Sequence, residues 1–361
     1  ATVPDIIAQL GERGTKAAVV ITAGFGEVGE GKALQQSLID TAASFGLRII
    51  GPNCLGILVP GVGLNASFAH ANPTPGKLAF VAQSGAIVTC VLDWAQARGI
   101  GFSHLVSLGD MADVDFSDML DYLANDWSTR AILLYIETIT SARKFMSAAR
   151  AAARMKPVIV VKAGRHAEGA RAVASHTGSL AGEDGVYDAV FRRAGMLRVF
   201  TLVELFDAVE TLAMTRSPKG NRLAILSNGG GIGVLATDAL IDHGGQLAQF
   251  SEDTVNKLNQ TLPPTWSHGN PVDIIGDAPA SRYADALEIL RQDRGVDGIL
   301  VLNCPTAVAS GSEAAQAVIE SPAGAGAPSL LTSWVGAGAA EQARRMFVEH
   351  RIPTFDTPEQ A

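Results

Sequence analysis

The sequence predicts a doubly wound α/β protein, in which buried parallel strands alternate with amphipathic helices. Short apolar runs bounded by Gly, Pro or Asn recur along the chain, as in parallel strands that are buried on both faces. Helical patterns lie between these runs, for example at 88–99 and 116–126. The pattern also occurs twice, which indicates a duplicated domain. In folds of this class, ligands bind at the carboxyl ends of the strands.

Eight apolar runs are expected to form strands, and each is short enough for a buried strand rather than a helix. They cover residues 17–22, 47–50, 77–83, 131–137, 157–164, 222–228, 298–303 and 329–336.

The repeat defines the domains. "KLAFVAQSGAI" (77–87) matches "RLAILSNGGGI" (222–232) in kind, and residues 116–137 align with 283–304 without a gap. Two homologous α/β domains are therefore expected at 74–217 and 218–361, beginning near Pro/Gly-rich stretches. Residues 1–73 form a third unit with two clear strands, too few for an independent sheet. The chain is expected to begin inside a domain.

Composition excludes several classes of function. The 361 residues carry a net charge of -8, so no basic stripe is available for nucleic acid. The three cysteines lie far apart without CxxC spacing, which argues against a disulfide framework or a thiolate zinc site and suits a reducing cytoplasm. No apolar stretch reaches membrane-spanning length, and no signal-peptide pattern is present. We expect a cytoplasmic protein with no nucleic-acid or membrane partner.

Two glycine-rich turns each follow a predicted strand and open a predicted helix. "AQSGAI" (82–87) and "SNGGGIG" (227–233) occupy equivalent points of the two copies. Glycine lets the backbone approach a ligand, and unpaired N–H groups at a helix start attract anions. A tight structural turn is the alternative reading. The residues expected to bind phosphate are Gln83, Ser84, Gly85, Gly229, Gly230 and Gly231.

The two copies differ in chemically reactive residues. Glu137 ends a predicted strand of the first copy, where the second copy has Cys304. His176, in the loop-like "ASHTGSLAG" (174–182), also has no counterpart. An incidental loop residue, a metal ligand and a catalytic group are all possible readings. No HxxH or HExxH spacing surrounds His166 and His176, so no metal site is expected. The hydrolase motif GxSxG is also absent. A nucleophile or general base assisted by a carboxylate is therefore favoured.

A third segment, "GLRIIGPNCLGIL" (46–58), combines a predicted strand with a turn. Gly51 and Pro52 shape the turn, and Asn53 offers an amide that both donates and accepts hydrogen bonds. A purely structural turn is equally compatible with these residues.

Together these segments resemble the NDP-forming acyl-CoA synthetases, which include ADP-forming acetyl-CoA synthetase and the α-subunit region of succinyl-CoA synthetase. The motifs are "GPNCLGI", "AQSGAI", "SLGDMADVDFSDMLDYLANDWSTRAILLYIE", "KAGRHAEGARAVASHTGSLAG", "SNGGGIGV" and "NPVDIIGDA". The resemblance implies a partial Rossmann-like CoA-binding domain at 1–73 and two flavodoxin-like CoA-ligase domains. It also implies an ATP-grasp domain on the same or a partner chain.

The implied reaction converts acid, CoA and ATP into acyl-CoA, ADP and phosphate, through an acyl phosphate and a phosphohistidine. By similarity, His176 is the phosphorylated histidine and Glu137 the glutamate that holds and activates it. The turns at 84–85 and 230–231 are similar to the paired helix N-termini that hold phosphate. The small neighbours Thr177, Gly178 and Ser179 would let the loop move between sites.

The cofactors and partners implied are CoA, a small carboxylic acid, phosphate, and ATP or ADP with Mg²⁺ through an ATP-grasp domain or β subunit; an oligomer is expected. The segment "GPNCLG" is similar to the family's segment at the pocket for the CoA thiol and acyl phosphate. Its residues are Gly51, Pro52, Asn53 and Cys54.

The chain also departs from the family pattern. The early CoA-phosphate loop and any ATP-grasp pattern are absent, so we expect activity only with an ATP-grasp part. Asp110 stands where relatives often have Asn. The alternative function is a CoA- or acyl-CoA-sensing region of a GNAT-type protein acetyltransferase. The sequence leaves the carboxylic acid open, because pocket shape decides it.

Overall fold

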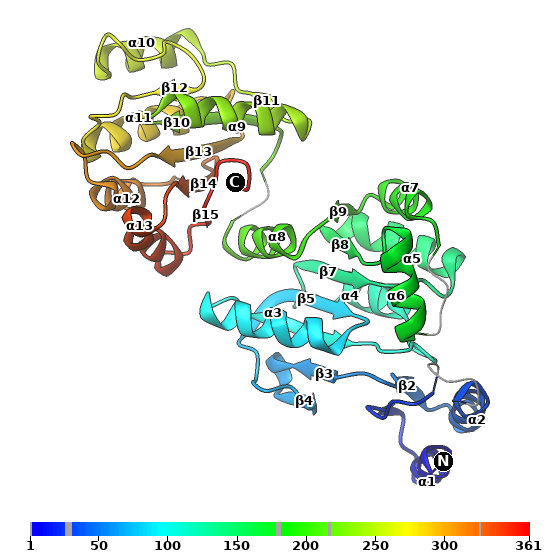
Figure 1. The fold of residues 1–361 in the computed structure, drawn as a ribbon. Helices are drawn as coiled ribbons and strands as arrows, with labels where there is room; N and C mark the ends of the chain where they lie inside the picture. Colours follow the sequence, from blue (N-terminus) through cyan, green and yellow to red (C-terminus); the bar gives the residue numbers. More distant parts are fainter. Residues whose placement is uncertain (1, 26–30, 178–181, 216–217, 325) are drawn as a thin grey trace. The chain divides into compact units, whose positions relative to one another are not determined.

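The computed structural model describes residues 2–25, 31–177, 182–215, 218–324 and 326–361, with the backbone alone for residues 175–177. Chain contacts divide it into two compact units, residues 1–209 and 210–361 (Figure 1). Each unit is described by itself.

The first unit holds nine strands and most of the helices. Its strands are β1 (Ala17–Val19), β2 (Arg48–Ile50), β3 (Gly56–Val59), β4 (Leu64–Ser67), β5 (Pro75–Ala82), β6 (Phe102–Ser107), β7 (Ala131–Ile136), β8 (Val158–Lys162) and β9 (Leu197–Val199). Its helices are α1 (Val3–Glu12), α2 (Gly31–Ser44), α3 (Gly85–Ala97), α4 (Phe116–Asn125), α5 (Ala142–Met155), α6 (Ala167–Thr177), α7 (Asp184–Ala194) and α8 (Leu202–Met214), which continues into the second unit; a 3₁₀ helix covers Pro60–Val62.

The main sheet of this unit has seven strands in the order β4-β3-β6-β5-β7-β8-β9. The five strands from β6 to β9 in this order are parallel, whereas β3 pairs antiparallel with both β4 and β6. Numbered along the chain from β5, the parallel strands follow the order 2-1-3-4-5 of flavodoxin-like sheets. The small sheet of β1 and β2 lies outside this order.

Both faces of the seven-stranded sheet are apolar, and this explains why the strands lack polar alternation. Ala79 and Val81 of β5 pack with Leu134 of β7 in a core that is covered by helices α4, α5 and α7. Phe80 and Leu133, which alternate with them, are equally buried. A strand buried on both sides therefore reads as a continuous apolar run.

The second unit repeats this architecture. Its strands are β10 (Arg222–Ser227), β11 (Gln246–Leu247), β12 (Val272–Asp273), β13 (Gly298–Asn303), β14 (Ser329–Trp334) and β15 (Thr354–Phe355). Its helices are α9 (Gly230–Asp242), α10 (Glu252–Thr261), α11 (Ala280–Gln292), α12 (Gly311–Glu320) and α13 (Gly338–Glu349).

All strand pairs in the second sheet are parallel, in the order β11-β10-β13-β14-β15, and β12 also pairs with β10. Ala224 and Leu226 face the core under α10 to α13, while Ile225 faces α9. The two sheets thus share their strand order, and their sequence repeat is a structural repeat.

The doubly wound α/β fold class is confirmed, and all eight predicted strands form. The strands not predicted are β3, β4, β6, β9, β11, β12 and β15. Most of these are two to four residues long, and the six-residue β6 carries Ser103, His104 and Ser107, all buried. Because of these polar residues, the apolar pattern did not predict β6, although β6 is a central strand of its sheet. The division into 1–73, 74–217 and 218–361 stays a prediction, and the seven-stranded sheet takes in β3 and β4 from the first of these ranges.

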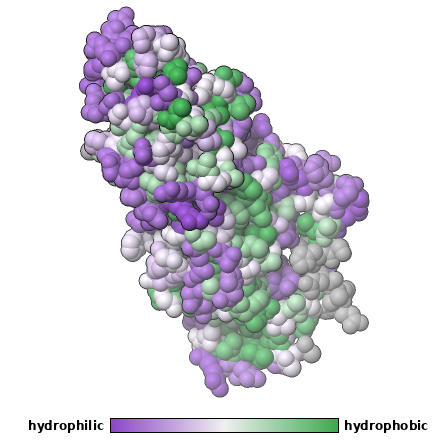
Figure 2. Space-filling model, turned by 60° about the vertical axis from the view of Figure 1, so that its left-hand side comes forward, coloured by the Kyte–Doolittle hydropathy of each residue, from purple (hydrophilic) through white to green (hydrophobic). Residues whose placement is uncertain are grey.

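The surface mixes hydrophobic and hydrophilic residues over the face in view (Figure 2). Isolated exposed apolar side chains such as Trp127 are ordinary in a protein of this size. Among the described residues, no helix is both long enough and apolar enough to cross a bilayer.

Candidate functional site

The candidate site lies at the carboxyl ends of β5 and β7. These neighbouring strands mark the point where the strand order reverses, and such a switch point opens a crevice for ligands in sheets of this kind. Gln83 and Ser84 follow β5, and Glu137 follows β7. The fold therefore brings together two segments that the sequence places far apart.

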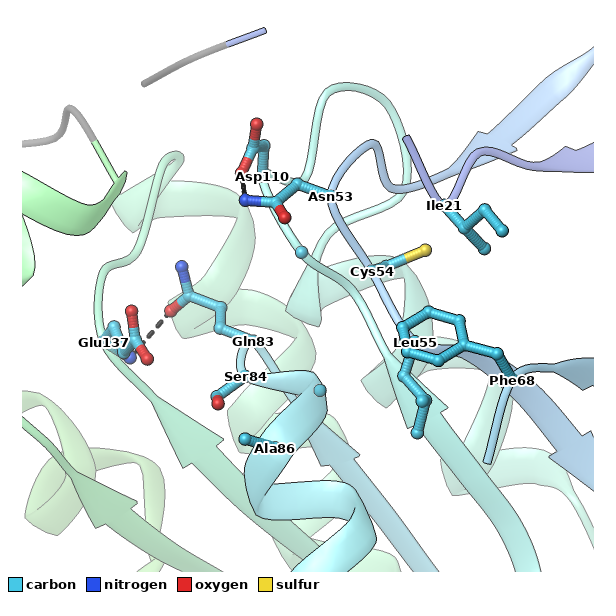
Figure 3. A pocket seen from close by; sticks show the side chains of 12 residues that line it. Ile21, Asn53, Cys54, Leu55, Phe68, Gln83, Ser84, Ala86, Asp110 and Glu137 are labelled. Carbon is cyan, nitrogen blue, oxygen red and sulfur yellow. Dashed lines mark hydrogen bonds between the residues drawn. The ribbon is translucent and has the colours of Figure 1, made fainter. Parts of the chain in front are cut away.

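A cavity of about 250 Å³ opens at this point (Figure 3). Asn53, Asp110, Gln83 and Glu137 lie toward one side of it, and Ile21, Cys54, Leu55 and Phe68 toward the other. The remaining lining residues are Ser84, Gly85, Ala86 and Gly109. Although Ile21 and Phe68 are large and apolar, they are 52% and 64% exposed. The cavity thus offers polar groups on one side and an apolar wall on the other.

Three glycines let three backbone segments meet at this cavity. A Cβ at Gly109, where φ is +57°, would collide with the carbonyl oxygens of Pro52 and Asn53. At Gly51, where φ is +100°, it would collide with the carbonyl oxygen of Val20. At Gly85 it would lie 3.0 Å from the Cβ of Leu55. Glycine at these positions therefore brings the "GPNCLG" segment against the start of α3.

The start of α3 is built to receive an anion. Ser84 is its N-cap, with an extended backbone and a hydroxyl oxygen that accepts a hydrogen bond from the N–H of Ile87 at 3.4 Å. The first N–H groups of a helix have no partner inside the helix, and they carry the positive end of its dipole. Ser84 and Gly85 both line the cavity, as expected of a phosphate turn.

Gln83, which the sequence analysis assigned to phosphate, has its side chain engaged elsewhere. Its Oε1 accepts hydrogen bonds from the backbone N–H groups of Glu137 and Thr138, both at 2.7 Å. Its Nε2 donates to the hydroxyl of Thr138 at 3.1 Å. The side chain thus ties the end of β5 to the chain that follows β7.

Glu137 is a buried carboxylate that lines the cavity, and the residue is only 6% exposed. Burial, and to a lesser extent the negative charge of Glu137, raise the pKa of the neighbouring Tyr135 to about 12. A buried carboxylate at a sheet switch point is suited to binding and orienting a base.

Asn53 and Asp110 lie together on the polar side of the cavity. Asn53 adopts a left-handed backbone with φ of 55°, and its Nδ2 donates to Asp110 Oδ1 at 3.3 Å. The N–H of Asp110 in turn donates to the carbonyl of Pro52 at 3.0 Å. Asp110 is therefore a second carboxylate of the cavity.

Cys54 lies in the cavity wall with its thiol directed at backbone carbonyls, with Val20 O at 3.4 Å from Sγ. Burial raises the pKa of this thiol to about 12, and the charge of Asp110 contributes to that rise. Both effects favour the protonated form of the thiol at neutral pH.

We expect iodoacetamide at pH 8 to modify the exposed Cys90 and to leave Cys54 unmodified in the folded protein. At pH 8 a thiol whose pKa is about 12 is almost entirely in its unreactive form, and burial also blocks the reagent. Peptide mass spectrometry before and after unfolding in urea measures both sites. Rapid modification of Cys54 in the folded protein contradicts this assignment.

His176 does not lie in a loop, so that expectation was wrong. Its backbone belongs to the last turn of α6, whose "AEGARAVASHT" sequence (167–177) is rich in alanine, the strongest helix former. Its side chain, and all of Gly178 and Ser179, lie outside the described residues. A contact between His176 and Glu137 therefore stays a prediction.

The equivalent turn of the second unit has the same backbone design but different surroundings. Gly229 is the N-cap of α9, and the space beside Gly231 is open. A Cβ at Gly230 would lie 3.1 Å from Oδ2 of Asp273, so a carboxylate stands beside this turn. Each turn thus has a carboxylate nearby, Asp273 in the second unit and Glu137 in the first. The prediction that both face one phosphate joins residues of separate units and stays a prediction.

Sequence reasoning missed a buried lysine beside the site. Lys162 ends β8, the strand next to β7, and its Nζ lies 4.5 Å from the ring centroid of Tyr187. Burial lowers the pKa of Lys162, although the charges of Asp184 and Glu137 counteract this. Burial raises the pKa of the nearby Tyr187, and the backbone at Ile139 and Gly182 offsets part of that rise. A charged residue ending the apolar run "PVIVVK" was the available signal.

Among the described residues, no three or more His, Cys, Asp or Glu side chains gather in a way that could hold a metal ion. The groups that the described cavity offers are backbone N–H groups, carboxylates and amides.

Two flavodoxin-like sheets in tandem, with a buried glutamate at the switch point of the first alone, define a protein of the CoA-ligase type. Residues 75–212 match the succinyl-CoA ligase like flavodoxin domain, and residues 223–360 match the ligase-CoA domain. The chain is 41% identical over 362 residues to the α subunit of acetate–CoA ligase [ADP-forming] I of Pyrococcus furiosus, covering 99% of this chain and 78% of that subunit. The chain belongs to the NDP-forming acyl-CoA synthetase family.

Other relatives agree. The acetate–CoA ligase [ADP-forming] I of Archaeoglobus fulgidus is also 41% identical, and here the chain spans 99% of its own length but about half (51%) of the relative. Among solved structures, the dinucleotide forming acetyl-coenzyme A synthetase 1 of Ca. Korarchaeum cryptofilum, in complex with phosphate and ADP, matches with a TM-score of 0.94 and 36% identity. That match covers 99% of this chain and 78% of the other. These relatives give no support to the acetyltransferase alternative.

Proposed function

We propose that this chain supplies the acyl-transfer and phosphohistidine parts of an ADP-forming acyl-CoA synthetase. Its reaction is acid plus CoA plus ATP giving acyl-CoA, ADP and phosphate. The observation that carries this proposal is the buried Glu137 opposite the start of α3, in the copy that also holds His176. A phosphoryl relay needs a carboxylate that orients the imidazole and, next to it, N–H groups that attract an anion.

The proposed steps balance as follows. A ring nitrogen of His176 attacks the γ-phosphorus of ATP, and ADP leaves. The phosphoryl group then passes to a carboxylate oxygen of the acid, which gives an acyl phosphate and restores the histidine. The CoA sulfur attacks the acyl carbon, phosphate leaves, and the thiol proton goes to solvent. The start of α3 would hold the transferred phosphoryl group, and Glu137 would stabilise the charged imidazole.

The remaining parts lie with partners and substrates. ATP and Mg²⁺ would be held by an ATP-grasp domain or β subunit, and CoA would approach the segment Gly51–Cys54. The second glycine turn, Gly229–Gly231, would hold phosphate during the reverse reaction. We further propose a homo- or hetero-oligomer in the cytoplasm, a location that suits three free cysteines.

The test uses this chain together with its ATP-grasp part. A panel of carboxylic acids is incubated with ATP, Mg²⁺ and CoA, and loss of free CoA thiol is followed alongside ADP release. We expect thiol loss and ADP release at equal rates with at least one acid. ATP-dependent thiol loss that releases AMP instead of ADP, or no thiol loss with any acid, contradicts the proposed function.

The cavity also favours acids with one carboxylate. The lining residues include two carboxylates, Asp110 and Glu137, and no Lys, Arg or His among the described side chains. The acid's reacting carboxylate would lie at the start of α3, and this would bring a second carboxylate near the negative charge of Asp110. An uncharged tail can instead contact Phe68 and Leu55.

We therefore expect Asp110→Asn to raise the kcat/KM for succinate relative to butyrate by about tenfold, because one like charge is removed from the pocket while the chain length of the acids stays equal. The ratio of the two specificity constants in the completed enzyme measures this, and butyrate is the matched control. An unchanged ratio shows that the acid's tail does not approach Asp110.

A further inference from the structure

Gln83 stands outside the chemistry described so far, although it lines the cavity and is only 5% exposed. The strand ladder between β5 and β7 ends with the pair Ala82 and Tyr135, followed by a hydrogen bond from the N–H of Gln83 to the carbonyl of Tyr135 at 3.2 Å. Beyond this point the chain at 137–138 leaves the pairing with β5. Its backbone N–H groups then need another acceptor.

The Gln83 side chain supplies that acceptor. Its single Oε1 receives both N–H groups of Glu137 and Thr138 at 2.7 Å, so both lone pairs of one oxygen are used. The Nε2 then donates to the Thr138 hydroxyl. Figure 3 shows this amide reaching toward the backbone of Glu137, at the base of its carboxylate. Two hydrogen bonds to the main chain, and a third to the Thr138 hydroxyl, therefore hold the segment from which the Glu137 carboxylate projects.

The second copy has an equivalent amide-to-backbone contact, but no carboxylate at the end of the neighbouring strand. Asn228 occupies the position equivalent to Gln83 and Cys304 the position equivalent to Glu137. Asn228 Oδ1 accepts from the N–H of Cys304 at 2.8 Å, and its Nδ2 donates to the carbonyl of the same residue at 2.9 Å. The shorter amide thus holds one residue in the copy without a glutamate. The longer amide holds two consecutive residues in the copy that has one.

We propose that Gln83 is a positioning residue for Glu137, one that fixes its backbone so that the buried carboxylate meets the base of the phosphoryl relay. This role rests on the proposed function. In this role Gln83 acts through Glu137, because its N–H bonds to β7 and its side-chain amide bonds to the chain that follows β7. The direct phosphate-binding role that the sequence suggested for this residue stays a prediction.

The experiment measures transfer of labelled γ-phosphate from ATP to His176 in a single turnover, with this chain completed by its ATP-grasp part. In Gln83→Leu, two buried N–H groups lose their acceptor and Glu137 loses its fixed position. We expect the rate at saturating ATP to fall about 100-fold, because misplacement of a catalytic group by about 1 Å has such an effect. The KM for ATP should stay unchanged, because the proposed role of Gln83 is to hold the backbone of Glu137 and not to bind the nucleotide.

Two further substitutions separate positioning from folding. Gln83→Glu keeps an oxygen that can accept both N–H groups but adds a negative charge beside Glu137, so its rate should lie between those of Gln83→Leu and the unmodified protein. Gln83→Asn introduces the shorter amide of the second copy, and it is the milder change if the leucine variant does not fold. This variant should slow the transfer without raising the KM for ATP.

The control is Ser103→Ala, at the opposite end of the same sheet. Ser103 and Thr129 share a buried hydrogen bond of 2.7 Å, so this change lowers the melting temperature without touching the site. We expect its transfer rate to stay within about twofold of the unmodified protein.

Gln83 variants that transfer phosphate at the unmodified rate, while their melting temperatures fall as in Ser103→Ala, overturn the positioning role and leave the proposed function intact. An unmodified protein that takes up no phosphate at His176 overturns the proposed function, and the positioning role with it.

Discussion

Replacing His176 by asparagine is expected to abolish phosphoryl transfer, with a loss of at least about 10⁴-fold in turnover, because removal of a nucleophile eliminates the covalent route. Asparagine keeps a polar side chain of similar reach but has no ring nitrogen that can carry phosphate. Since His176 lies in the last turn of α6, this change is compatible with the helix. The completed enzyme is incubated with labelled ATP and Mg²⁺, and protein-bound label is measured.

The chemistry of the label identifies its site. Phosphate on a histidine nitrogen is released by acid and survives base, whereas phosphate on a carboxylate is lost in base. His166, ten residues earlier in the sequence, offers the matched control because His166→Asn removes an imidazole from the same region. We expect that variant to be labelled normally. Acid-labile, base-stable label that persists in His176→Asn rejects the relay.

Glu137→Gln is expected to lower turnover by about 10³ to 10⁴-fold, comparable to the replacement of a carboxylate that orients a catalytic imidazole by its amide. Glutamine keeps the size and the backbone contacts with Gln83, so the loss reports the charge and the hydrogen-bond acceptor rather than packing. The KM for CoA should change little. Steady-state kinetics with the best acid of the panel measure both constants.

A second readout distinguishes a local effect from a damaged fold. The negative charge of Glu137 helps to hold the pKa of Tyr135 high, so the neutral glutamine should lower the pKa of Tyr135 from about 12. Ultraviolet titration of the tyrosines detects the shift. A variant with full turnover would show that Glu137 is a structural residue of the strand end.

The sequence predicted the parts of this fold that depend on continuous burial. Six of the eight apolar runs became strands of the two large sheets, and the repeat predicted a glycine turn at the same point of each copy. β6 was not predicted, because Ser103, His104 and Ser107 interrupt its apolar pattern although they are buried. The antiparallel pair β3 and β4 was not predicted, because β6, the strand that β3 pairs with in the sheet, lies far along the chain.

The site was predictable as a set of residues but not as a set of contacts. Glu137 and the first glycine turn do meet at one cavity, as the strand ends required. The role of Gln83 was not predictable, because nothing in "AQSGAI" tells whether the amide faces a ligand or the backbone of a neighbouring strand. Asp273 beside Gly230 depends likewise on the course of a distant loop.

The meeting of Gly51, Gly85 and Gly109 has an evolutionary consequence. The polar side of the cavity depends on these glycines, because a side chain at Gly51 or Gly109 would collide with neighbouring backbone and one at Gly85 would crowd Leu55. The opposite wall consists of side chains such as Phe68 and Ile21, which are exposed and free to vary. Substitutions in that wall would therefore change contacts with the acid's tail while leaving the glycine positions of the polar side untouched.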